Sequence, residues 1–259
     1  MSISQADLDD LHYAKSLLEN PGLAAKIVNI IGTPLEKGFD ILPSGWKDMV
    51  ASSTQKALQV AINSAILTMG RTARPQAANT LHKLMAAGSG AAGGFWGLPA
   101  LPLELPISTT IMLRSIADIG RSEGQSLDDP RTKIACMEVF ALGGKSKEDD
   151  AVESGYFTIR SGLAKAVNDA AQHLARKGLN AKSSPVLLKL ITQISSRFGV
   201  QVSEKIAAQA IPIIGAAGGA VINTLFIDHF QAMARGHFIV LRLEQKYGQD
   251  TVRNAYTGL

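Results

Sequence analysis

The stretch IPIIGAAGGAVINTLFID, residues 211–228, contains a five-residue word, Gly-Ala-Ala-Gly-Gly, that also occurs at residues 90–94. In both copies the first and last glycines are four residues apart. At this spacing two helix backbones can touch, because no side chain larger than hydrogen stands between them. We therefore expect the closest helix packing of the molecule at Gly90, Gly94, Gly215 and Gly219.

The composition favours helices over strands. Hydrophobic residues make up 46% of the chain but aromatic residues only 5%, so Ala, Ile, Leu and Val carry the apolar content. No alternating run is bounded by a hairpin turn such as Asn-Gly or Asp-Gly. We predict an all-α fold, a single-domain helical bundle built around two glycine-rich apolar helical hairpins. N-terminal helices in residues 1–42 are expected to pack on a helical domain in residues 43–259.

Signals for helix starts recur in the first part of the chain. Ser4, followed by Asp7, predicts a first helix that ends before Asn20. Residues 33–36, Thr-Pro-Leu-Glu, predict a capping box at the start of a short helix. Residues 43–45, Pro-Ser-Gly, precede a longer helix with apolar residues at helical spacing, namely Trp46, Met49, Val50, Ala57, Val60, Ala61 and Leu67.

Prolines set further boundaries. Pro99, Pro102 and Pro106 disfavour one continuous helix and predict a bend between two apolar arms, the second running from Pro106 to about Glu123.

Two further helices are expected to begin at Asp129-Pro130 and at Ser184-Pro185, the second of them ending near Gly199. Residues 200–248 keep a helical pattern.

Charge and cysteine content restrict the class of protein. The net charge is +4, but the 26 Lys and Arg are interspersed with 22 acidic residues and form no cluster, so we expect no nucleic-acid partner. The single cysteine, Cys136, lies in an apolar run, which indicates a buried thiol and excludes an internal disulfide. Residues 1–10 lack the basic region of a secretory signal, and we expect a cytoplasmic location.

Two phosphate-binding patterns are incomplete. Residues 88–93, Gly-Ser-Gly-Ala-Ala-Gly, match the dinucleotide fingerprint, but a helical pattern precedes them where the fingerprint needs a strand. Residues 144–146, Gly-Lys-Ser, match the end of a P-loop, but Val139 stands where its first glycine should be. We expect no bound cofactor.

Seven ionisable residues lie in apolar surroundings. An unpaired charge there is unfavourable by on the order of several kcal/mol, so these side chains should pair with one another or reach water. They are Glu104, Arg114, Asp118, Asp228, His229, Arg235 and His237. Arg114 and Asp118 are four residues apart on one predicted helix and can form an ion pair.

The residues Asp228, His229, Arg235 and His237 place a potential base near a carboxylate and a cation. This combination is typical of a catalytic or anion-binding pocket and suggests a hydrolase. The alternative, which we favour, is that they form structural ion pairs at the ends of the hairpins. His229 and His237 lack a third ligand at metal-binding spacing, so we expect no metal site.

Two uncharged stretches raise the question of a membrane span. Between Lys83 and Glu104 lie 20 residues, and between Lys205 and Asp228 lie 22. As a helix the second stretch would reach about 33 Å, against a hydrocarbon core of about 30 Å. Its alanines and glycines make it only weakly hydrophobic, and the prolines and Glu104 disfavour insertion of the first. We favour buried core hairpins, with reversible membrane insertion as the alternative.

Three segments resemble the EcsC protein family. They are AAGGFWGLPALPLELPISTTIMLRSIADIGRSEG at residues 91–124, DPRTKIACMEVFALGG at residues 129–144, and GAAGGAVINTLFIDHFQAMARGHFIVLRLEQKYG at residues 215–248. The resemblance covers roughly the last 200 residues, and the first 40 or so look peculiar to this chain.

The family is named for a bacterial operon that also encodes an ABC transporter, and the resemblance implies no reaction and no catalytic residue. It groups six residues of these segments as one constellation, Glu104, Arg114, Asp118, Asn223, Asp228 and Arg235. We take Glu104, Arg114, Asp118 and Asn223 as candidate binding residues.

These patterns predict a non-enzymatic accessory protein, cytoplasmic or peripheral at the inner face of the membrane. We expect its partner to be membrane lipid or an integral membrane protein such as an ABC transporter, bound through the apolar hairpins. Two alternatives stay open, a hydrolase that uses the cluster at residues 228–237 and a structural oligomeric scaffold.

Overall fold

The computed structural model describes residues 3–19, 22–65, 99, 101–143, 155–177, 184–211 and 215–259. Within these residues all regular structure is helical, and the buried apolar side chains form one core, so the predicted all-α, single-domain fold is confirmed. The helices are α1 (Gln5–Leu18), α2 (Leu23–Ile31), α3 (Glu36–Ile41), α4 (Trp46–Ala65), α6 (Leu101–Ser122), α7 (Pro130–Glu138), the 3-10 turn η2 (Val139–Ala141), α8 (Gly155–Lys177), α9 (Pro185–Ala210), α10 (Gly215–Tyr247) and α11 (Gln249–Gly258).

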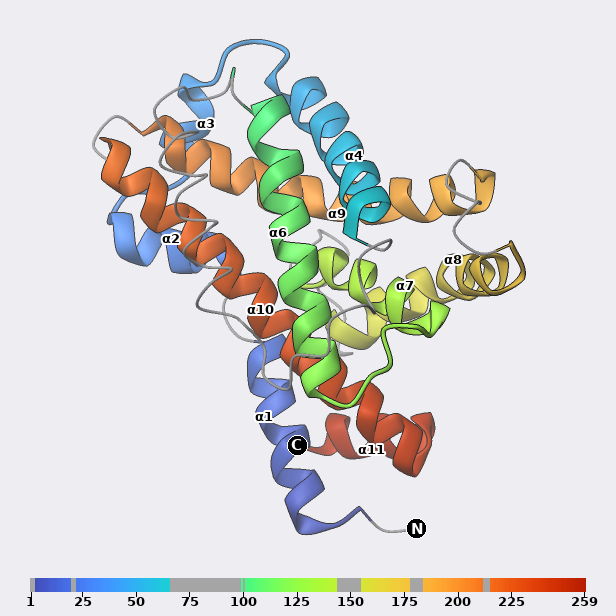
Figure 1. Ribbon diagram of the computed structural model, residues 1–259. Coiled ribbons are helices and arrows are strands. Elements are labelled where there is room, and N and C mark those ends of the chain that lie inside the picture. Colours follow the sequence, from blue (N-terminus) through green and yellow to red (C-terminus); the bar gives the residue numbers. More distant parts are fainter. Residues whose placement is uncertain are drawn as a thin grey trace.

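The long helix α10 organises the bundle (Figure 1). It packs against α1, α2, α6, α9 and α11, while α4 packs against both α6 and α9. The first turns of α4, α6 and α10 and the short helix α3 lie toward one end of the molecule, at the top of Figure 1. Helices α1 and α11 and the last turns of α10 lie toward the opposite end.

Three predicted helix starts are confirmed, and each has an N-cap. The side chains of Ser4, Asp129 and Ser184 accept hydrogen bonds from backbone N–H groups of the first turns of α1, α7 and α9, at 3.3, 2.8 and 3.2 Å. Each cap satisfies an N–H group that has no carbonyl partner within its helix. The sequence signal is reliable at these positions because both partners lie within three residues of each other.

The predicted capping box at residues 33–36 is wrong. Helix α3 begins only at Glu36, and Leu35, at its N-cap, makes no side-chain hydrogen bond. The Thr33 hydroxyl instead donates to the backbone carbonyl of Ile31, at 3.5 Å. The threonine therefore helps to close the end of α2, where Gly32 adopts a left-handed conformation.

Helix α6 begins five residues before the start predicted at Pro106. Pro102 stands in its first turn, where the missing N–H group would have had no helical partner. Pro106 lies inside the helix and removes one backbone hydrogen bond. The buried side chains of Leu105 and Thr109 hold this part of α6 against the core, so packing outweighs the loss of that bond.

Helix α9 does not end near Gly199, where the sequence predicts its end. A glycine in a helix interior is unfavourable by about 1 kcal/mol. The side chains of Phe198, Gln201 and Val202 around it are fully buried. Their packing outweighs this local preference, and the helix continues for a further three turns.

The amphipathic pattern of α4 is confirmed only in part. Val50, Ala57 and Ala61 are buried, as predicted, but Met49 and Val60 are exposed. Among the described helices, α6 and α9 make the main contacts with α4, and the apolar stripe in the sequence is wider than the surface that these two helices cover. Leu67 lies outside the described residues.

The tightest described glycine contacts lie outside the repeated word. A Cβ atom on Gly38 of α3 would overlap the backbone carbonyl of Ala207 on α9. A Cβ atom on Gly236 of α10 would lie 2.7 Å from Cγ of Leu18 on α1. Two helix crossings therefore require glycine at positions that carry no GxxxG pattern.

The packing role of the repeated word stays a prediction. Gly90 and Gly94 lie outside the described residues, Gly215 begins α10, and Gly219 is buried.

Four phenylalanine rings form the centre of the core. The centroids of neighbouring rings lie 4.9 to 6.0 Å apart, and the residues are Phe140, Phe198, Phe226 and Phe230. Cys136 is buried, as predicted, and burial raises the pKa of its thiol to about 12.

Candidate functional site

A buried ion pair lies where α6, α9 and α10 meet. The Lys205 ammonium is 2.5 Å from Oε1 of Glu104, and the Asn223 side-chain amide donates to the same oxygen at 3.4 Å. The Lys205 side chain is 0% exposed and the Glu104 side chain 7%. The ammonium also lies 5.2 Å from the centre of the Phe226 ring, within the range of a cation–π interaction.

This cluster joins two of the predicted binding residues, Glu104 and Asn223, to Lys205, which the sequence analysis missed as a site residue. The sequence contained a signal for this pairing, because Glu104 follows the first uncharged stretch and Lys205 precedes the second. Each is surrounded by apolar positions, and a buried charge is stable only when it is paired. Opposite charges at the edges of two apolar stretches were therefore candidates for pairing.

The other two predicted binding residues lie elsewhere on α6. Arg114 is exposed, ten residues or about 15 Å along the helix from Glu104. Asp118 forms an ion pair with Arg121 on the next turn. The predicted binding constellation is thus divided between a buried cluster and a partly exposed helix face.

His229 is packed inside the bundle. Its side chain is buried, and a Cβ atom on Gly143 would lie 2.6 Å from the imidazole ring. Neither ring nitrogen has a hydrogen-bond partner within the described ranges. Burial, with a smaller effect from the positive charge of Lys26, lowers the pKa of His229 to about 3, so the ring is neutral at pH 7.

His237 belongs to a second buried cluster. Its Nδ1 atom shares a hydrogen bond of 2.9 Å with the Tyr156 hydroxyl, and its Nε2 atom lies 3.8 Å from Oε2 of Glu138. Burial, followed by the charge of Arg160, lowers the pKa of His237 well below its usual value. Burial raises the pKa of the Glu138 carboxyl to about 7, an effect that Arg160 opposes and Glu244 increases.

Glu138 also lines a cavity of about 590 Å³ between α7, α8, α10 and α11. Arg160 and Glu244 lie beside it, and the two guanidinium nitrogens of Arg160 donate to the two carboxylate oxygens of Glu244 at 2.7 and 2.9 Å. Phe157 and Leu241 contribute apolar surface to the wall. The volume falls in the range of about 300 to 1,000 Å³ that is usual for small-molecule sites.

The cavity residues were not predicted from the sequence. Glu138, Arg160 and Glu244 stand on three different helices and follow no spacing that links them. Only the tertiary packing brings them together.

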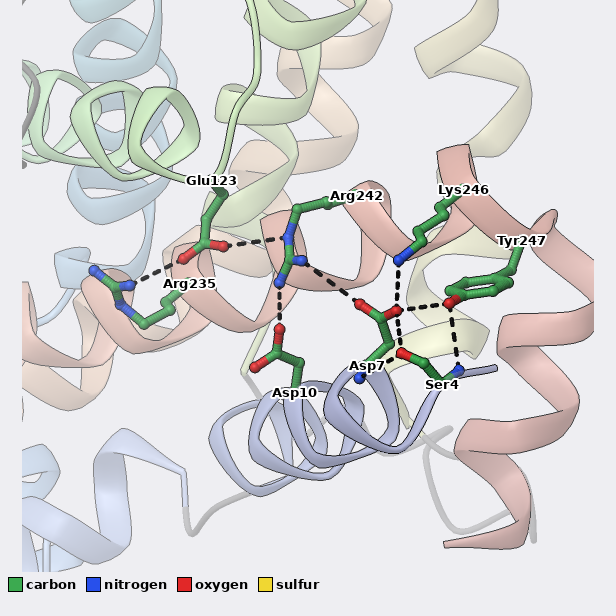
Figure 2. A network of polar contacts seen from close by, with 8 residues as sticks. All are labelled: Ser4, Asp7, Asp10, Glu123, Arg235, Arg242, Lys246 and Tyr247. Carbon is green, nitrogen blue, oxygen red and sulfur yellow. Dashed lines mark hydrogen bonds and ion pairs between the residues drawn. The ribbon is translucent and has the colours of Figure 1, made fainter. Parts of the chain in front are cut away.

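Arg235 lies in a network of ion pairs that joins α1, α6 and α10 (Figure 2). Its guanidinium is 2.9 Å from Oε1 of Glu123, whose other oxygen is 3.6 Å from Nε of Arg242. Arg242 in turn lies 2.7 Å from Asp10 and 3.9 Å from Asp7. Arg235 therefore links α10 to the turn that follows α6.

Asp7 is the other centre of this network (Figure 2). Its Oδ2 atom accepts hydrogen bonds from Lys246 at 2.7 Å, from Ser4 at 2.6 Å and from Tyr247 at 2.6 Å. These bonds, that of Lys246 above all, hold the pKa of Asp7 well below its usual value. The contacts fasten the start of α1 to the end of α10.

Three of the four predicted catalytic residues contact different neighbours among the described residues. His229 packs against Gly143, Arg235 pairs with Glu123, and His237 bonds to Tyr156. Asp228 is half-buried. The catalytic assignment stays a prediction, without a shared site to support it. Within the described ranges no three His, Cys, Asp or Glu side chains come together as metal ligands.

Comparison with known proteins identifies a family. The model of the EcsC protein family matches residues 7–243, and this range includes N-terminal helices that the sequence resemblance left out. No curated protein and no solved structure matches the chain.

Proposed function

The chain belongs to the EcsC protein family, and from that premise we propose that it is a non-enzymatic accessory protein that makes peripheral contact with membrane lipid. The observation that carries the proposal is the exposure of Leu103 and Ile107 on α6, at 77% and 55%. The two side chains are four residues apart, so they lie on the same face of the helix. None of the described helices is long and apolar enough to cross a membrane.

Further apolar side chains are exposed at this end of the bundle. Ile41, the last residue of α3, is 55% exposed, and Val221, near the start of α10, is 45% exposed. The elements that carry them lie toward the same end of the molecule as the first turn of α6 (Figure 1). Exposed apolar residues gathered at one end are typical of a surface that contacts lipid or another protein.

The expected strength of this contact is modest. Full transfer of one leucine or isoleucine side chain from water contributes about 1.5 to 3 kcal/mol. A few such side chains give weak, reversible binding to the membrane interface, as expected for a peripheral protein. An integral membrane protein, such as the ABC transporter that the family resemblance implies as a partner, would add affinity at the same surface.

Vesicle flotation tests the proposal. Vesicles of phosphatidylethanolamine and phosphatidylglycerol should carry the wild-type protein to the top of a density gradient, whereas a variant with both Leu103→Glu and Ile107→Glu should stay at the bottom. Leu188→Glu is the matched control, because Leu188 is 36% exposed in the first turn of α9, far from the start of α6 in Figure 1. Wild-type protein that fails to float, or a double variant that floats equally well, would refute lipid contact at this surface.

A further inference from the structure

The cavity between α7, α8, α10 and α11 contains a carboxyl group, that of Glu138, which forms no ion pair with an arginine or lysine of the described residues. Glu138 lines the cavity but is only 6% exposed. Within the described residues its one polar contact is the 3.8 Å approach to Nε2 of His237, a neutral ring. Arg160, the nearby guanidinium, already gives both terminal nitrogens to Glu244.

Acidic side chains also outnumber basic ones in the described lining of the cavity. Among the described residues, the lining contains four that are acidic, Asp129, Glu138, Glu244 and Asp250, and three arginines, Arg131, Arg160 and Arg253. With all of them ionised the lining carries one negative charge in excess, four minus three. Close to Glu138 the acidic groups are also in excess, because Arg160, the arginine whose charge acts on this carboxyl, is already paired with Glu244.

Burial raises the pKa of Glu138 to about 7 and the charge of Glu244 adds to the rise, although Arg160 opposes it. The carboxylate form therefore lacks sufficient compensation in the ligand-free protein. A bound positive charge would supply it, because an opposite charge within hydrogen-bond distance favours the ionised carboxyl.

We propose that this cavity binds a small organic cation, a primary or secondary amine whose ammonium group pairs with Glu138 and whose apolar part lies against Phe157 and Leu241. The cavity of about 590 Å³ has room for such a body beside the charge. An anion beside Glu138 is disfavoured, because it would be repelled by this carboxylate and would have to compete with Glu244 for Arg160. This site is separate from the apolar surface at the start of α6 and does not depend on membrane contact.

Titration calorimetry with three probes of similar shape tests the charge preference. Benzylamine is the cation, benzoate the anion and benzyl alcohol the neutral analogue. Benzylamine should bind at least about tenfold more tightly than either of the others, because only it can compensate the buried carboxylate. Equal affinity for the three probes, tighter binding of benzoate, or no binding of benzylamine would overturn the proposal.

Three variants locate the binding. Glu138→Gln should weaken benzylamine binding at least about tenfold, since it removes the charge but keeps the shape. Glu204→Gln is the matched control: burial raises the pKa of Glu204 to about 7 as well, but this residue on α9 does not line the cavity. Ala164→Phe, at an exposed position of α8 that lines the cavity, should block the site without disturbing the core.

Far-UV circular dichroism of each variant establishes that it is folded. Benzylamine binding that survives both Glu138→Gln and Ala164→Phe, or that is lost in Glu204→Gln, would place the site elsewhere and overturn the proposal. The Ala164→Phe variant keeps the test decisive if Glu138→Gln does not fold.

Discussion

Replacing Lys205 by methionine removes an ammonium group from a position where the lysine side chain is 0% exposed. The Glu104 carboxylate, 7% exposed, then keeps only the 3.4 Å hydrogen bond from Asn223 within the described residues. Breaking a buried ion pair on one side destabilises a protein by about 3 to 5 kcal/mol, because the remaining charge is still desolvated. The free energy of unfolding of a domain is about 5 to 15 kcal/mol, so this loss is a large fraction of it. Urea unfolding, monitored by circular dichroism, should therefore show a large decrease in the midpoint concentration.

The reverse change, Glu104→Gln, should destabilise by a similar amount because it strands the Lys205 ammonium. Combining Glu104→Gln with Lys205→Met removes both charges. The free energy of unfolding of the double variant should therefore exceed, by at least about 2 kcal/mol, the value expected from adding the two single effects. Asp10→Asn is the control: Asp10 pairs with Arg242 at 2.7 Å, but the two side chains are 47% and 35% exposed, and the change should be below about 1 kcal/mol. Single effects that add within about 0.5 kcal/mol would show that the buried pair is not energetically coupled and would refute the reasoning.

Three further predictions concern packing and pH. Gly38→Ala should destabilise the protein by about 1 to 3 kcal/mol, because its Cβ atom would overlap the α9 backbone. The control is Gly162→Ala in α8, which has open space around it and should be neutral or stabilising. Urea unfolding midpoints measure both variants, and equal effects would exclude close packing at Gly38. His229 has a folded pKa of about 3 against 6.5 in the unfolded chain, so the unfolded chain binds more protons between these values and stability falls as the pH drops through them. His229→Leu should make this fall shallower between pH 7 and pH 5, and a slope equal to that of the wild type would contradict the burial of a neutral ring. The pKa of Asp7 lies below its usual 3.8, so its carboxylate stabilises the fold fully at a pH above 3.8 and less as the pH falls. The difference in melting temperature between the wild type and Asp7→Asn should therefore narrow as the pH falls below about 4. A constant difference would argue against the hydrogen bond between Asp7 and Lys246.

Local signals in the sequence were sufficient for the helix starts at Ser4, Asp129 and Ser184. A cap and its N–H partner are neighbours in the chain, so no tertiary information is needed. The same local reasoning failed at Gly199, where the packing of Phe198 and its neighbours outweighed the glycine. Helix ends depend on what the helix packs against, and the sequence pattern alone does not specify this.

The candidate site, too, was only partly predictable from the sequence. Glu104 was identified as a charge that needed a partner, but its partner Lys205 stands 101 residues away and served in the sequence analysis only as the end of an apolar stretch. The cavity around Glu138 was beyond such reasoning, because Arg160 and Glu244 come to it from separate helices. His229 and His237 were grouped because they are close in sequence, but eight residues of helix separate them by about 12 Å along the axis of α10 and place them beside different neighbours.

Lipid contact at the start of α6 is tested most directly by a fluorescent probe at position 103. Cys136 is the sole cysteine of the chain and is buried with a raised pKa, so a Leu103→Cys variant can be labelled selectively with the environment-sensitive dye NBD. On addition of phosphatidylethanolamine and phosphatidylglycerol vesicles, the emission of the label should shift to the blue and be quenched by spin-labelled lipid. The same label on Leu188→Cys should change in neither respect. An unchanged spectrum at position 103, or equal changes at both positions, would contradict the proposed membrane contact.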